Sequence, residues 1–232
     1  ISKKALLYTE MVVAKALHHN PNKRNLLDFY EIEHPISIQL GGDNPTLLSE
    51  ATKMAEFWGY DEVYLNLGCP SAKVSAGNFG ASLMANPDQV ARCVEAMAKS
   101  TSLPITIKTR LGIDNLDSDE LLLKFIDKIA AAGAKRFVIH ARKAWLQGLN
   151  PKQNRTIPPL QPERVFNLKK KRQNLIIELN GGIRSIIDSQ NALKNCDGAM
   201  VGRSAYEEPM KWHAVDSLIF GEPEKKIKAS TV

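Results

Sequence analysis

The chain has 232 residues, of which 44% are hydrophobic and 24% charged, and its formal net charge is +6. This length suffices for one large domain, no apolar run is long enough to span a membrane, and three cysteines without metal-type spacing argue against a disulfide framework and for a reducing compartment. The positive charge permits a polyanionic partner such as nucleic acid, although charge alone does not establish one.

Short apolar runs alternate with amphipathic helical stretches along the chain. We predict strands near Leu6 and over 35–40, 63–67, 104–110, 136–141, 175–182 and 198–203. Helical patterns lie between them, over 46–58, 87–98, 118–132 and 185–193. This alternation is typical of a parallel sheet with crossover helices, and seven such units predict an α/β fold, a TIM (β/α)₈ barrel without its first strand–helix unit. We expect the barrel over residues 1–220, a polar tail over 221–232, and a longer parent protein, because both ends look cut.

The active site of such a barrel forms at the carboxyl ends of its strands. Each predicted strand ends on polar, charged or glycine residues, namely Glu10, Gln39, Asn66 with Cys69, Lys108 with Arg110, His140 with Arg142, Asn180-Gly181-Gly182 and Gly202-Arg203. One polar residue at a loop entrance is weak evidence for function. A complete ring of them predicts a functional cleft.

The last two strand ends fit a phosphate site. Gly181, Gly182 and Gly202 offer backbone N–H groups, and Arg203 adds a charged donor. Alternatively, Gly181 and Gly182 only form a tight turn. Lys108 lies within an apolar run, where a charge is expected to be functional, so we predict that it holds an anionic group at the barrel mouth rather than reaching out to solvent.

Other strand-end residues are less specific. A lone histidine such as His140 is more often a packing residue, and the Gln39 amide, which could contact a cofactor, could equally bond to a loop. Cys93 lies on an amphipathic helix and Cys196 precedes a strand, so both are interpreted as structural. Cys69 differs, because a Gly-Cys-Pro turn carries it beyond a strand end. Since a thiol is ordinarily protonated at neutral pH, Cys69 can act as an acid, unless the turn merely reverses the chain.

Five segments resemble one known family. They are "LNLGCPSAKVSAGNFGASLM" (65–84), "KTRLGID" (108–114), "IHARKAWLQGLNPKQNRTIPPL" (139–160), "NGGI" (180–183) and "VGRSAY" (201–206). Together they resemble the tRNA-dihydrouridine synthases, and the long loop resembles the A-type branch, which acts at positions 20 and 20a. The resemblance runs from about residue 6 to about residue 216, in order.

The resemblance implies an FMN-containing barrel that reduces uridine to 5,6-dihydrouridine in the tRNA D-loop, with NADPH as electron donor. Hydride would pass from reduced FMN to C6, and Cys69 would give a proton to C5. It implies FMN contacts at Gln39, Lys108, His140, Asn180, Gly181, Gly182, Gly202 and Arg203, with Asn66 facing the target base. The basic loop with Arg142, Lys143, Gln153 and Thr156 would contact tRNA; without the resemblance it reads as a solvated charged loop.

Two parts of the family pattern are absent: a first strand with a Pro-Met turn, and a C-terminal helical domain that grips tRNA. We expect a cytoplasmic monomer without metal or membrane contact, or an organellar protein if a transit peptide has been removed. Two rival interpretations stay open. One is an FMN barrel reductase of a small pyrimidine-like molecule, similar to dihydroorotate dehydrogenases, and the other is a non-catalytic RNA-binding relative.

Overall fold

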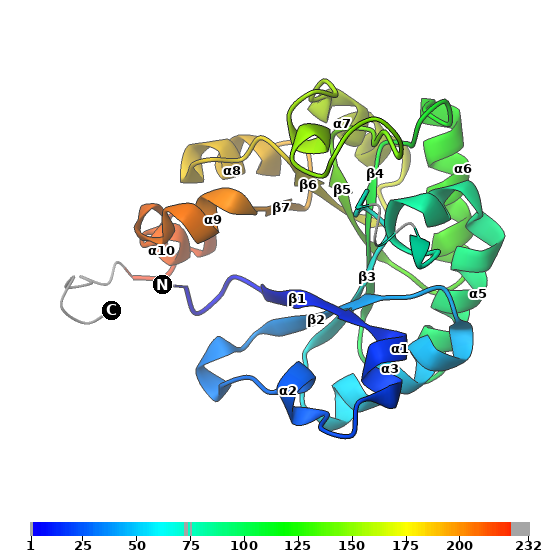
Figure 1. Ribbon diagram of the computed structural model, residues 1–232. Helices are drawn as coiled ribbons and strands as arrows, with labels where there is room; N and C mark the ends of the chain where they lie inside the picture. Colours follow the sequence, from blue (N-terminus) through cyan, green and yellow to red (C-terminus); the bar gives the residue numbers. More distant parts are fainter. Residues whose placement is uncertain (1, 72–73, 75, 224–232) are drawn as a thin grey trace.

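Seven parallel strands form one curled sheet in the computed structural model, which describes residues 2–71, 74 and 76–223. The sheet order is β1-β2-β3-β4-β5-β6-β7, so each strand pairs with the next one in sequence. Their bounds are β1 Leu7–Val13, β2 Ile36–Gly41, β3 Glu62–Asn66, β4 Ile105–Arg110, β5 Arg136–His140, β6 Ile176–Asn180 and β7 Gly198–Met200. Helices surround the outside of the curled sheet (Figure 1). The predicted α/β class and all seven strands are confirmed.

Four of the described helices begin at side-chain caps that the sequence provides. Asn44, Asn86, Ser118 and Ser185 each accept a backbone N–H of the first turn, which satisfies donors left free at a helix start. The helices are α1 Ala14–His19, α2 Arg24–Leu27, α3 Pro45–Phe57, α5 Pro87–Ala98, α6 Asp119–Ala131, α7 Pro162–Lys171, α8 Ile186–Leu193, α9 Arg203–Glu207 and α10 Val215–Phe220. Four 3₁₀ helices join them, η1 Glu31–Glu33, η2 Gly80–Ala85, η3 Gln153–Arg155 and η4 Pro209–Trp212. The four predicted helices therefore match α3, α5, α6 and α8 to within one residue at each end.

The core lies on both faces of the sheet, as expected for parallel strands covered by helices. Ile38, Leu65 and Ile107 are fully buried in consecutive strands, and helix residues such as Leu48 and Ile126 are equally buried. The structural interpretation of Cys93 and Cys196 is confirmed, because both are buried, whereas Cys69 is only half-buried.

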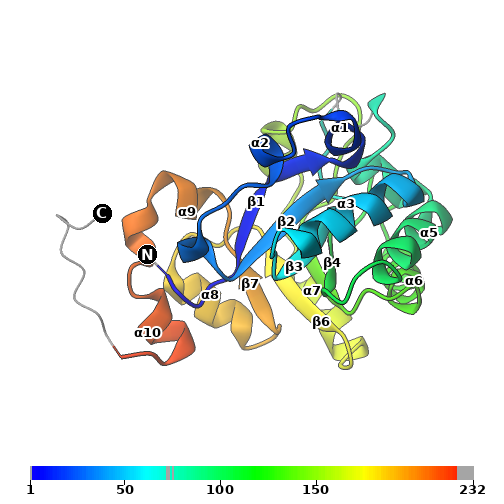
Figure 2. The same ribbon diagram turned by 90° about the horizontal axis from the view of Figure 1, so that it is seen from below.

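The barrel is open between its edge strands, because β1 and β7 do not pair within the described part of the chain. A cavity of about 830 Å³ follows this opening to the amino ends of the strands and is lined by residues of β1, β7 and α10, among others. Figure 2 shows β1 beside α8, α9 and β7 around this opening. Inside it, Arg136 bonds to Glu62 at 2.9 Å and to Glu178 at 2.5 Å. The cavity is therefore distinct from the carboxyl-end face.

No described helix is both long and apolar enough to cross a membrane. The described residues likewise contain no group of three or more His, Cys, Asp or Glu side chains placed to hold a metal ion. The predicted polar tail over 221–232 falls mostly on residues 224–232, which lie outside the described residues.

Candidate active site

The turn after β3 holds Cys69 in place through bonds from three directions. The Asn66 side-chain oxygen accepts the backbone N–H groups of Gly68 at 2.9 Å and Cys69 at 3.1 Å. The Cys69 carbonyl accepts the N–H of Ala81 at 2.9 Å, and Arg110 Nε donates to the Gly68 carbonyl at 2.7 Å. The Asn66 side chain thus takes the place of a backbone acceptor in the turn, as Asn side chains do when they bond to the backbone two residues on. The half-buried thiol is thus carried on a fixed backbone.

Gly80 allows a second segment to pack against this turn. Its φ is +73°, and a Cβ there would lie 2.7 Å from the Cys69 carbonyl oxygen. Such a contact with backbone has no way to relax, and the left-handed conformation also favours glycine. The glycine-bearing segment after Cys69 therefore serves to hold the turn from its far side.

Amide side chains connect the first three strands. Asn66 Nδ2 donates to Gln39 Oε1 at 2.5 Å, and Gln39 Nε2 donates to the Thr9 carbonyl at 2.9 Å. These bonds connect β3, β2 and β1 in sequence across the barrel mouth. The structure thus brings Gln39 and Asn66 together beside the Cys69 turn.

Two titratable groups lie on the neighbouring strands, and burial disfavours their charged forms. Burial lowers the pKa of Lys108 to about 7, with the nearby positive charge of Arg110 adding to the effect. Burial lowers the pKa of His140 to about 2, helped by Lys108 and three arginines nearby. In register, Lys108 pairs with Asn66 and Arg110 pairs with His140. The face is therefore short of negative charge, and His140 is a neutral imidazole at physiological pH.

The predicted phosphate residues lie at the ends of β6 and β7. Asn180 Nδ2 donates to the Met200 carbonyl at 2.9 Å, which fixes the two strand ends to each other. Gly181 and Gly182 have φ values of +103° and +78°, and a Cβ on Gly181 would lie 2.6 Å from His140 Cδ2. A Cβ on Gly202 would meet no atom within 4 Å, and its φ is −114°. Packing thus requires the first two glycines, whereas Gly202 borders open space.

Arginines concentrate further positive charge on the same face. Burial lowers the pKa of Arg142, and the nearby positive charge of Arg203 adds to the effect. Arg142 also donates to the Pro158 carbonyl. Arg155 Nε is buried and has no hydrogen-bond partner. Within the described residues, no carboxylate pairs with any of the cations on this face, Lys108, Arg110, Arg142, Arg155 and Arg203. Such an uncompensated cluster fits an anionic ligand.

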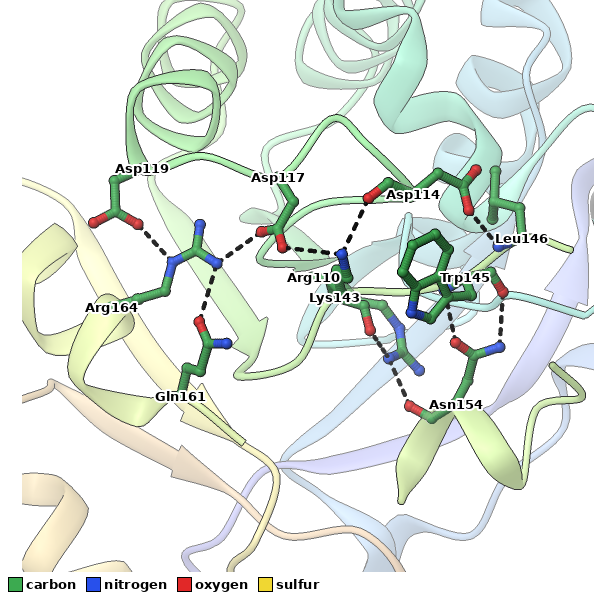
Figure 3. Close-up of polar contacts among 10 residues, drawn as sticks. All are labelled: Arg110, Asp114, Asp117, Asp119, Lys143, Trp145, Leu146, Asn154, Gln161 and Arg164. Atoms are coloured by element: carbon green, nitrogen blue, oxygen red, sulfur yellow. Dashed lines mark hydrogen bonds and ion pairs between the residues drawn. The ribbon is translucent and has the colours of Figure 1, made fainter. Parts of the chain in front are cut away.

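The loop between β5 and α7 is folded onto the loop that follows β4 (Figure 3). Lys143 Nζ lies 4.1 Å from the centre of the Trp145 ring, donates to the Asp114 carbonyl at 3.3 Å and is 3.6 Å from Asp117 Oδ2. Asn154 is fully buried; its Oδ1 accepts the Trp145 N–H, and its Nδ2 donates to the Trp145 carbonyl. Lys143 thus makes its contacts within the chain. Its contact with tRNA stays a prediction.

Gln153 and Thr156 lie at the exposed end of this loop. Gln153 begins the short η3 helix and exchanges hydrogen bonds of 2.9 Å with Asn150. The Thr156 hydroxyl donates to backbone carbonyls of the same turn. Both side chains are exposed, so a partner that docks on this loop can contact them.

The structure gives roles to residues for which the sequence indicates none. Arg110 belongs to the predicted ring of strand-end residues, where it has no assigned role; it is 3% exposed, and its charge within an apolar run is the same signal that indicates a function for Lys108. Asn154 and Asp117 gave no sequence signal, because their importance comes from contacts between loops. The basic run over 168–172 forms the end of α7, where Arg172 at the C-cap pairs with Asp127.

The family model described as "Dihydrouridine synthase (Dus)" matches residues 1–232. A protein of Synechocystis sp. named tRNA-dihydrouridine(20/20a) synthase is 52% identical over 220 residues, covering 95% of this chain and 66% of the relative. A protein of Escherichia coli strain K12 with the same name is 49% identical over 225 residues, covering 97% of this chain and 65% of the relative.

A solved structure described as a putative phosphonomutase from Burkholderia cenocepacia superposes with a TM-score of 0.56 at 16% identity. The match covers 90% of this chain and 82% of that chain, and at such low identity it reflects a shared fold alone. The chain spans about two thirds of the length of the curated relatives that it matches.

Proposed function

The chain belongs to the dihydrouridine synthase family, and on that basis we propose that its parent protein reduces uridine to 5,6-dihydrouridine in the D-loop of tRNA, at positions 20 and 20a. One observation of the structure carries the proposal furthest: a thiol fixed at a strand end shares its face with five cations that no described carboxylate neutralises. That combination fits an acid beside a polyanionic substrate. A reductase of a small pyrimidine-like molecule would share the cations that face the cofactor but would not need the basic loop between β5 and α7.

The donor set on this face fits FMN, which we propose as the cofactor, with NADPH as reductant. Gly181, Gly182, Gly202 and Arg203 would hold the phosphate, since Gly202 borders open space and Arg203 has no described ionic partner. Gln39, Lys108, His140 and Asn180 would contact the ring system. When bound and reduced, FMN supplies the hydride that goes to C6 of uracil.

In this proposal Lys108 stabilises the negative charge of the reduced flavin. Its pKa of about 7 reflects burial, and the nearby positive charge of Arg110 adds to the effect. A nearby anion would favour the charged ammonium, so Lys108 would bind a proton as the anion binds. His140, neutral because of the same positive surroundings, would donate or accept a hydrogen bond without adding charge.

Cys69 would give its thiol proton to C5 of uracil, on the ring face opposite to the one that receives hydride. A general acid must lie within hydrogen-bond reach of the atom that it protonates. The bonds from Asn66, Ala81 and Arg110 to the Cys69 turn supply that fixed placement. Asn66, whose amide lies next to the thiol turn, would face the target base.

The target uridine must leave its stack to enter the barrel mouth. We propose that Gln153 and Thr156 contact the RNA at the exposed loop end, and that Arg142 and Lys143 provide positive charge behind them. In the complete protein, one further strand would close the barrel between β1 and β7, and a C-terminal helical domain would grip the tRNA. We propose that the complete protein works as a monomer in the cytoplasm.

Deletion of the complete gene tests this function. Nucleoside mass spectrometry of tRNA, with mapping of each D-loop position, should show loss of dihydrouridine at positions 20 and 20a and its return on complementation with the full-length gene. Unchanged dihydrouridine at those positions in the deletion strain would contradict the proposal and favour a small-molecule substrate.

A further inference from the structure

One buried guanidinium bonds to two segments of the active-site face. Arg110, at the end of β4, is 3% exposed. Its Nε donates to the Gly68 carbonyl at 2.7 Å, next to Cys69. Its NH1 donates to the Asn154 carbonyl at 3.2 Å and to the Lys143 carbonyl at 3.3 Å (Figure 3). The same side chain therefore bonds to the thiol turn and to two points of the loop between β5 and α7.

A buried charge without a carboxylate partner costs stability. Its presence here therefore indicates a role other than stabilising the fold. Burial lowers the pKa of Arg110 to about 10, and the described residues offer it only backbone carbonyls. Arginine suits such a position because its planar group presents donors in fixed directions, whereas lysine has one flexible donor atom. The guanidinium can therefore keep all its bonds only when the Gly68 carbonyl and the carbonyls of Lys143 and Asn154 hold a fixed position relative to each other.

We propose that Arg110 is a positioning residue that links the placement of the Cys69 turn to the loop that receives the RNA. A shift of the carbonyls of Lys143 and Asn154, as RNA seats on the loop, would be transmitted through the guanidinium to Gly68. The acid would thereby reach its working position when the substrate is seated. This inference rests on the function proposed above, and it adds a residue that acts through Cys69 rather than on the substrate itself.

Arg164 provides a matched control. It is another mostly buried arginine, and it bonds to Asp117 at 2.7 Å, to Asp119 at 2.5 Å and to Gln161 at 3.2 Å. These bonds support the loops but do not reach the Cys69 turn. The test uses the complete flavin-loaded protein with Arg110→Lys or Arg164→Lys, and both variants keep the positive charge.

Hydrogen exchange gives a readout that does not depend on activity. Arg110→Lys should speed amide exchange about tenfold in peptides covering both 66–71 and 143–155, the factor expected for one lost hydrogen bond to a charged group. Arg164→Lys should speed exchange only around its own partners, Asp117, Asp119 and Gln161. Faster exchange throughout the protein with Arg110→Lys, or in only one of its two peptides, would overturn the proposal.

The second readout is a single turnover, in which NADPH-reduced enzyme is reoxidised by saturating unmodified tRNA. Arg110→Lys should leave flavin reduction unchanged and slow reoxidation about tenfold, whereas Arg164→Lys should reoxidise within about twofold of wild type. Reoxidation of the Arg110 variant at the wild-type rate would contradict the proposal. If wild-type enzyme itself is not reoxidised by tRNA, the proposed function fails, and the exchange experiment still decides the role of Arg110.

Discussion

The side-chain oxygen of Asn66 accepts the backbone N–H of Cys69 at 3.1 Å, so the end of β3 and the thiol-bearing turn form one unit. The same oxygen accepts the Gly68 N–H, and the Asn66 amide nitrogen donates to Gln39. One side chain therefore orders the turn through its oxygen and the strand ends through its nitrogen.

Substitutions at Asn66 separate these two roles. Asn66→Ala removes both and should slow uridine reduction more than Asn66→Asp, which keeps an acceptor for the turn but loses the donor to Gln39. Each lost hydrogen bond should lower the free energy of unfolding by about 1 kcal/mol. Single-turnover reoxidation by tRNA and urea unfolding measure the two effects. Equal reoxidation rates for the two variants would show that the turn does not depend on the Asn66 oxygen.

The glycines at the ends of β6 and β7 allow a paired test of the phosphate site. Gly181→Ala should lower the free energy of unfolding by at least ~1–2 kcal/mol, because the position has φ +103° and the new Cβ would meet His140. Gly202→Ala should leave the melting temperature unchanged, because its Cβ enters open space. If that space receives the FMN phosphate, Gly202→Ala should nevertheless weaken FMN binding. Unchanged FMN affinity in Gly202→Ala would remove Gly202 from the site.

Lys108 should make the stability of the flavin-free protein depend on pH. Its pKa falls from 10.5 to about 7 on folding, so between these values the unfolded chain binds more protons than the folded one. Stability therefore rises with pH across this window, and the unfavourable burial of the charge is fully present below about pH 7.

Urea unfolding at several pH values between 7 and 10 measures this dependence. The wild-type protein should gain stability relative to Lys108→Met as the pH rises. Lys99→Met, at the exposed C-terminal end of α5, is the control and should show no such gain. If the difference in the free energy of unfolding between wild type and Lys108→Met does not vary with pH, burial does not lower the pKa of Lys108.

The sequence was sufficient for the fold because its signals are local. Alternating apolar runs and helix caps such as Asn86 and Ser118 depend on neighbours in the chain, and the corresponding elements lie where they were predicted.

The site was only partly predictable, because much of it depends on contacts between distant segments. Strand-end positions identified Asn66, Lys108 and His140 by location alone. The bonds of Arg110 to carbonyls 33 to 44 residues away follow no sequence pattern. The contacts of Lys143 with Trp145 and Asp117 are of the same kind. The sequence thus indicates the positive charge of this loop, but it does not indicate which of the loop's cations bond to other residues of the chain.

Cys69→Ala tests the central claim most directly. The variant should bind FMN and be reduced by NADPH as wild type is, because the thiol takes no part in those steps. The control, Cys196→Ala, removes a buried thiol far along the chain from the Cys69 turn and should keep wild-type uridine reduction.

The deciding measurement is the rate at which NADPH-reduced, full-length Cys69→Ala enzyme is reoxidised by saturating unmodified tRNA. Loss of a positioned general acid predicts a rate about 10²–10⁴-fold below wild type. Reoxidation at the wild-type rate, with dihydrouridine formed at positions 20 and 20a, would show that the uracil receives its proton from another group.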